Sequence, residues 1–141
     1  MQLAILLVLT AVFYGLYNVF IKISSNNMHP LSGMLMLQLG AILIGVSVFA
    51  YLKATKFSLV FTPRGVTFAF LAGVFVALAE TTTFYLFSKG VPASVGIPSI
   101  VGGGVVASAL LGFFLLREPL APIQIGAIAM VDAGIAVLAG R

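Results

Sequence analysis

Long apolar runs follow one another along this chain with little sequence between them. They can be separated at polar residues, prolines and glycines, and they are Leu3–Ile23, Ser32–Leu52, Val66–Phe87, Ala93–Leu116 and Leu120–Ala139. A helix of about 20 residues crosses the ~30 Å hydrocarbon core of a bilayer. No run alternates apolar and polar residues, as a membrane β-strand would. The sequence therefore predicts an all-α integral membrane protein, with five transmembrane helices in a single domain over residues 1–141.

Composition excludes the water-soluble classes. The chain is 62% hydrophobic and 7% charged, whereas soluble domains are about 25% charged. It has no cysteine, and its single histidine, His29, precedes a proline between two runs, so we expect no metal site and no cofactor. The seven Lys and Arg residues lie at or near the ends of the runs. This pattern indicates contacts with lipid headgroups and argues against nucleic-acid binding.

The fourth run is irregular for a transmembrane helix. A proline frees a backbone carbonyl, a triplet of glycines lets another backbone approach, and small residues recur at every fourth position. The residues concerned are Pro98, Gly102, Gly103, Gly104, Ser108 and Gly112. The pattern favours tight helix packing, and a bend beside a substrate cavity is compatible with it.

The chain has three acidic residues, and two lie inside runs. A carboxylate at the bilayer centre costs about 3 kcal/mol on insertion scales. Helix geometry places Glu80 about 6 Å and Asp132 about 3 Å from the middle of their runs, so each should face protein or water. Glu118 closes the fourth run, where we expect it to stabilise the start of the last helix; gating is the alternative.

The first run offers a polar ridge that could face these acids. Thr10, Tyr14, Asn18 and Lys22 are spaced four apart, with Tyr17 beside them. The ridge is either a cavity wall or a source of hydrogen bonds between helices. The candidate residues for binding substrate or protons are Glu80, Asp132, Tyr14, Tyr17, Asn18 and Thr83.

Burial disfavours the ionised form of a carboxyl group, so a buried acid can carry a proton or exchange it for a cationic substrate. We assign this role first to Glu80. A structural carboxyl, hydrogen-bonded to a tyrosine or threonine, is the alternative. The same structural role is an alternative for Asp132, and so are a place in the central cavity and a place in a dimer seam.

An ordered set of residues in the segment 84–140 resembles a known family. The set is Pro92-Ala93-Ser94, Pro98, Glu118, Gln124 and Gly134. It is similar to the EamA domain of the drug/metabolite transporter superfamily. Members usually carry two five-helix repeats in one chain, and this chain has one, so the resemblance implies a ten-helix working unit with substrate bound between two repeats. The family usually has apolar residues at the positions of Glu80 and Asp132, so it does not assign their roles.

The basic residues are nearly balanced between the two sides of the predicted membrane protein. Lys53, Lys56, Arg64 and Arg117 fall on the side of the N-terminus, and Lys22, Lys89 and Arg141 on the other. Because Lys/Arg asymmetry sets orientation, a count of four against three favours dual topology and an antiparallel homodimer. A single orientation with another assembly remains open.

Together these features predict a secondary transporter of a small metabolite or drug in a prokaryotic inner membrane, proton-coupled through Glu80. The alternative is a non-transporting membrane subunit, or one half of a heteromeric transporter or lipid-linked-sugar flippase. We do not expect an enzyme, because Asp132 lies in VDAG rather than the GxGD of intramembrane aspartyl proteases.

Overall fold

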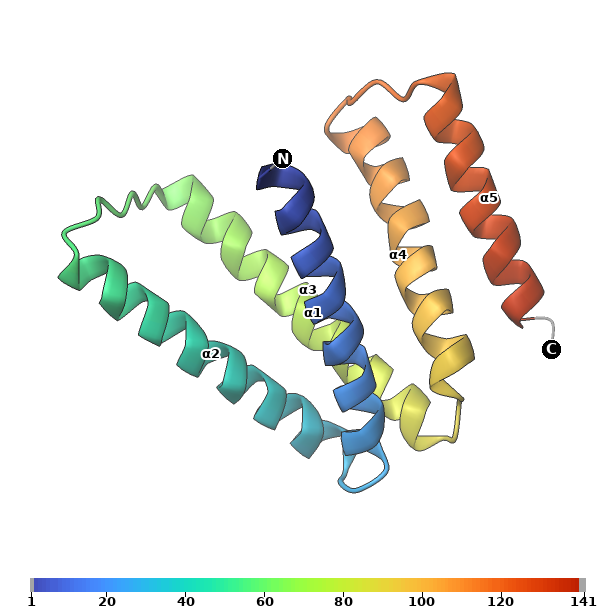
Figure 1. The fold of residues 1–141 in the computed structure, drawn as a ribbon, viewed down its shortest axis with the longest axis horizontal. Helices are drawn as coiled ribbons and strands as arrows, with labels where there is room; N and C mark the ends of the chain where they lie inside the picture. Colours follow the sequence, from blue (N-terminus) through green and yellow to red (C-terminus); the bar gives the residue numbers. More distant parts are fainter. Residues whose placement is uncertain (1, 140–141) are drawn as a thin grey trace. The chain divides into compact units, whose positions relative to one another are not determined.

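The computed structural model describes residues 2–139, which form five helices (Figure 1). They are α1 (Gln2–Ser25), α2 (Pro30–Ala54), α3 (Pro63–Ser88), α4 (Ala93–Leu115) and α5 (Pro122–Ala139). Their ends lie within three residues of the predicted runs. Within the described part of the chain, α1 to α4 are long and apolar enough to cross a membrane. The all-helical prediction is confirmed, whereas the fifth span stays a prediction. Arg141 lies outside the described residues.

Prolines begin three of the helices. Pro30, Pro63 and Pro122 are the first residues of α2, α3 and α5. Proline suits this position because its missing N–H would have no intrahelical partner there. The side chains of His29 and Thr62 accept hydrogen bonds from backbone N–H groups in the first turns of α2 and α3. The starts of these helices are therefore capped, as a chain passing into hydrocarbon requires.

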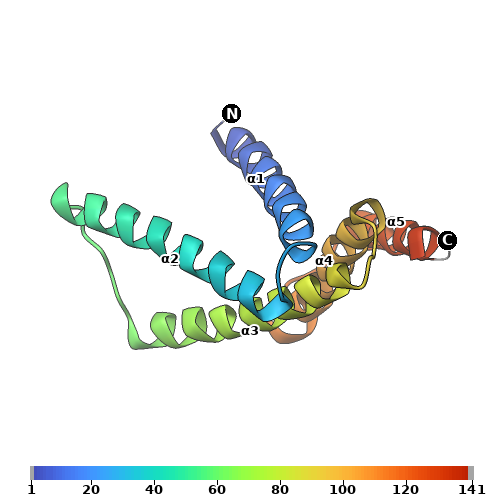
Figure 2. The same cartoon turned by 90° about the horizontal axis from the view of Figure 1, so that it is seen from below.

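The chain divides into two compact units, residues 1–90 with α1 to α3 and residues 91–141 with α4 and α5. In the first unit α3 contacts both α1 and α2. Figures 1 and 2 show these three helices closest together at the turn between α1 and α2 and splayed apart at their opposite ends. The core of this unit therefore lies at one end of its helices.

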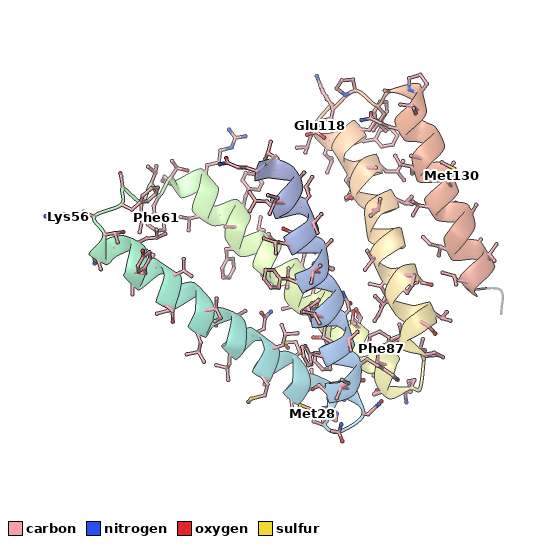
Figure 3. All side chains as sticks on the ribbon, viewed as in Figure 1. Met28, Lys56, Phe61, Phe87, Glu118 and Met130 are labelled. Carbon is pink, nitrogen blue, oxygen red and sulfur yellow. The ribbon has the colours of Figure 1, made fainter. Side chains whose placement is uncertain are left out.

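Aromatic side chains of α3 fill that end. Phe84 and Phe87 are 1% and 0% exposed, and Ile21 of α1 is 2% exposed. Figure 3 labels Phe87 near the end of α3. A Cβ atom placed on Gly33 of α2 would lie 2.7 Å from Cδ1 of Phe84. The missing side chain at Gly33 thus lets the Phe84 ring lie against the α2 backbone.

The second unit is held by a similar contact. A Cβ atom on Gly102 of α4 would lie 2.7 Å from Cδ1 of Ile135 in α5, so α5 packs closely over this glycine. After α4 the chain turns at Arg117, which has a left-handed φ of 56°. Glu118, labelled in Figure 3, folds back so that Oε2 lies 3.1 Å from a Cβ placed on Gly112.

We predict that Gly33→Ala destabilises the first unit, because the added methyl group collides with the buried Phe84 ring. Overpacking of this kind costs about 1–3 kcal/mol. Gly40→Ala is the control on the same helix, since a Cβ there meets nothing within 4 Å. Thermal unfolding in detergent should show a lower midpoint for Gly33→Ala alone. Equal midpoints for the two variants would contradict the packing described.

Candidate functional site

The site forms where α1 meets α3. The Tyr17 hydroxyl of α1 donates a hydrogen bond to Oε1 of Glu80 in α3. Glu80 is 8% exposed. Its second oxygen, Oε2, is buried and has no hydrogen-bond partner among residues 2–139. A buried carboxyl group with one oxygen bonded and one free can take a proton or a hydrogen-bond donor at the free oxygen.

The polar neighbours of Glu80 direct their hydrogen bonds elsewhere. Buried Thr83 donates to the Ala79 carbonyl at 2.8 Å, and buried Asn18 donates from Nδ2 to the Tyr14 carbonyl at 2.8 Å. The hydroxyls of Thr81 and Thr82 also donate to carbonyls of α3. Within the described chain, the hydrogen bond to Glu80 therefore comes from Tyr17 alone.

One face of α3, formed by Gly73, Val76, Glu80, Thr83 and Phe87, is covered over only part of its length. Thr83 and Phe87 are buried with Glu80, whereas Val76 is 48% exposed and a Cβ on Gly73 would meet nothing within 4 Å. The covered part is the end at which α1, α2 and α3 converge. Glu80 therefore lies at the edge of the packed region, next to the part where the helices diverge.

Tyr17 also connects Glu80 to a hollow in the first unit. The hollow has a volume of about 370 Å³ and is lined by side chains of α1, α2 and α3, including Tyr17, Phe20, Met36 and Phe84. Its walls are mainly apolar, as in most small-molecule sites. The hollow can take an apolar group of a small molecule, and Tyr17, the partner of Glu80, lines it, whereas Glu80 itself does not.

Lys22 does not supply a charge to Glu80 in this arrangement. Its Nζ donates to the Phe87 carbonyl at 3.1 Å and lies 5.5 Å from the centroid of the Phe87 ring. The last turn of α3 has no basic residue of its own, so Lys22 places a cation from α1 at the negative end of that helix. The carbonyl that Lys22 binds is that of Phe87, about two helical turns beyond Glu80. We therefore assign Lys22 a role in packing α1 against α3.

The rest of the predicted polar ridge is less buried. Tyr14 is 55% exposed, with its ring centroid 5.4 Å from that of Tyr17. Thr10 is exposed and donates to the Leu6 carbonyl. The ridge therefore contributes Asn18 and Lys22 to the packed end, while Tyr17, beside it, makes the contact with the acid.

The remaining predicted residues belong to the second unit. Asp132 is exposed on α5. Gln124 accepts a hydrogen bond from the Ala121 N–H at 2.8 Å and so caps the start of α5. Pro98 lies inside α4, and Ser108 donates to the Val105 carbonyl of the same helix. A Cβ on any of three other glycines would meet nothing within 4 Å, and these are Gly103, Gly104 and Gly134. Their roles, and that of Asp132, stay predictions.

The described residues contain no group of three His, Cys, Asp or Glu side chains that could hold a metal ion. Long apolar helices define a multi-pass membrane protein, and a buried carboxyl group inside one of them is typical of transporters. The chain belongs to the EamA-like transporter family, whose model matches residues 1–140. This family comprises membrane transporters of small solutes and is generally not enzymatic. Comparisons with curated proteins and with solved structures give no match.

We predict that Tyr17→Phe destabilises the protein, because it leaves both oxygens of buried Glu80 without a partner. Loss of a partner from a buried polar group costs about 1–3 kcal/mol. Tyr14→Phe is the matched control. Tyr14 is exposed, so loss of its hydroxyl group should change the free energy of unfolding by less than about 0.5 kcal/mol. Unfolding of both variants in detergent provides the measurement. Equal stability of the two would show that the hydrogen bond contributes nothing.

Proposed function

We propose that the protein is a secondary transporter of a small metabolite or drug-like compound, coupled to protons through Glu80. The observation that carries this proposal is the buried Glu80 carboxyl group, whose Oε1 accepts from Tyr17 and whose Oε2 has no partner among the described residues. A lone acid in a membrane helix marks a proton or substrate pathway more often than a packing contact. The adjacent hollow lined by Tyr17 supports the same assignment.

Glu80 alternates between two states in this mechanism. In the neutral state the proton resides on Oε2, and Tyr17 still donates to Oε1. In the ionised state Oε2 accepts a hydrogen bond from an ammonium or hydroxyl group of the substrate. Proton and substrate therefore compete for one oxygen atom. Tyr17 keeps the carboxyl group oriented in both states, because its hydroxyl can donate to the carbonyl oxygen of the acid and, more strongly, to the anion.

The working unit in this proposal is an antiparallel homodimer. The near balance of basic residues, four against three, supports insertion in both orientations. The small-residue positions Gly104 and Ser108 are exposed on α4, so they are available to a helix of a second copy. Two inverted copies would enclose substrate between two repeats, as inverted repeats do in many transporters.

We predict that Glu80→Gln abolishes coupling while the protein still folds, because the amide keeps the shape of the acid and can still accept from Tyr17. A ligand is first found by a thermal-shift screen of the purified protein against metabolites. Adding that ligand in weakly buffered detergent should release protons from wild type and not from Glu80→Gln. Uphill transport should be lost as well, whereas passive exchange should survive.

Glu118→Gln is the control for this experiment, because it removes an exposed acid from the turn after α4. It should release protons as wild type does. Equal proton release from wild type and Glu80→Gln would remove Glu80 from the mechanism.

Dual topology predicts that each loop is accessible from both sides of the membrane. The chain has no cysteine, so single cysteines can be placed at Asn27, between α1 and α2, and at Ser58, between α2 and α3. In intact cells an impermeant thiol reagent should label a fraction of each variant. Labelling of one variant completely and the other not at all would establish a single orientation and end the antiparallel proposal.

A further inference from the structure

A second hollow lies in the first unit, between the start of α2 and the end of α3. Its volume is about 520 Å³, and its lining includes His29, Leu31, Thr82, Tyr85, Ser88 and Lys89. His29 is the residue before α2 and Lys89 the residue after α3. Both helices are long and apolar enough to cross a membrane, so this hollow is at the level where a membrane span meets the lipid headgroups.

The hydrogen-bond donors of this hollow come from Lys89 and His29. The Lys89 ammonium lies 5.0 Å from the centroid of the Tyr85 ring, a cation–π contact that holds it beside the hollow. His29 Nδ1 accepts from the Leu31 N–H at 3.3 Å. A neutral imidazole that accepts at Nδ1 carries its proton on Nε2, so His29 also offers a donor.

The hydroxyl groups of the hollow are not free donors. Thr82 donates to the Ala79 carbonyl and Ser88 to the Tyr85 carbonyl, each at 2.8 Å. None of the chain's three acids is among the lining residues. The described residues therefore form a hollow with a positive charge at its rim, no opposing carboxylate, and apolar surface from Leu31, Tyr85 and the threonine methyl group.

We propose that this hollow binds one anionic phospholipid. Its phosphate accepts hydrogen bonds from Lys89 and His29, and the first part of an acyl chain lies along Leu31, Thr82 and Tyr85. A phospholipid matches both the cationic rim and the apolar wall, and it is already present at this depth of the membrane. Free phosphate matches the rim alone. Lys and Arg residues between membrane helices recognise anionic headgroups by the same charge complementarity.

Native mass spectrometry of the full chain, released from micelles doped with phosphatidylglycerol or phosphatidylcholine, tests the proposal. Wild type should retain one phosphatidylglycerol in preference to phosphatidylcholine. Lys89→Gln should weaken this retention about fivefold, the effect of losing one Lys near the membrane surface, on the order of 1 kcal/mol. Lys53→Gln is the control, because Lys53 is an exposed lysine in the last turn of α2, at the other end of that helix.

Filling the hollow provides a second variant that does not depend on charge. Thr82 is exposed, so Thr82→Trp should fold and exclude the lipid while Lys89 remains. Equal retention of both lipids, or retention unchanged in Lys89→Gln and Thr82→Trp, would mean ordinary contact with surrounding lipid and would overturn the proposal. Displacement of phosphatidylglycerol by millimolar inorganic phosphate would overturn it too, in favour of a soluble anion. None of these results depends on transport or on Glu80.

Discussion

Hydrocarbon offers no hydrogen-bond partner, and this constraint governs the rest of the structure. Backbone groups pair within the helices, and hydroxyl side chains do the same. Thr10, Ser47 and Thr67 each donate to the carbonyl four residues earlier. Among residues 2–139, by contrast, two side-chain hydrogen bonds cross from α1 to α3, one from Tyr17 and one from Lys22. The hydrogen bond from Tyr17 reaches the acid Glu80.

Apolar helices that share few hydrogen bonds are held together by close packing of complementary surfaces. In the first unit a glycine allows this close packing. The ring of Phe84 fits against Gly33, so this pair brings a side chain of α3 against the backbone of α2. Because such contacts gather at the convergent end, the helices are free to diverge beyond it (Figure 2). Glu80 lies between the convergent end of the helices and the part where they diverge. At this position the carboxyl group is buried at the edge of the packed end.

The sequence was sufficient to predict the helices, because lipid selects for apolar runs of a definite length, and to single out Glu80 as a charge inside such a run. It was not sufficient to predict which tyrosine contacts that acid. Tyr14 and Asn18 lie on the four-residue ridge, but rotation of α1 against α3 brings Tyr17 to the carboxyl group, and periodicity within one helix does not determine its rotation against another. Gly33 carried no signal either, since it is one of 15 glycines and its partner is remote in sequence. Asp132 is exposed on α5, so its role stays a prediction.

The contacts from Tyr17 to Glu80 and from Lys22 to Phe87 join residues 63 and 65 positions apart. Both therefore connect α1 and α3 in nearly the same parallel register. A single contact would allow the two helices to rotate about it, whereas two contacts separated along the axis fix both their angle and their register. A slide of α1 by one turn, about 5.4 Å, would have to open both together. In the proposed transporter, α1 and α3 would therefore move together, and an alternating-access motion would fall to α2 or to the proposed second subunit.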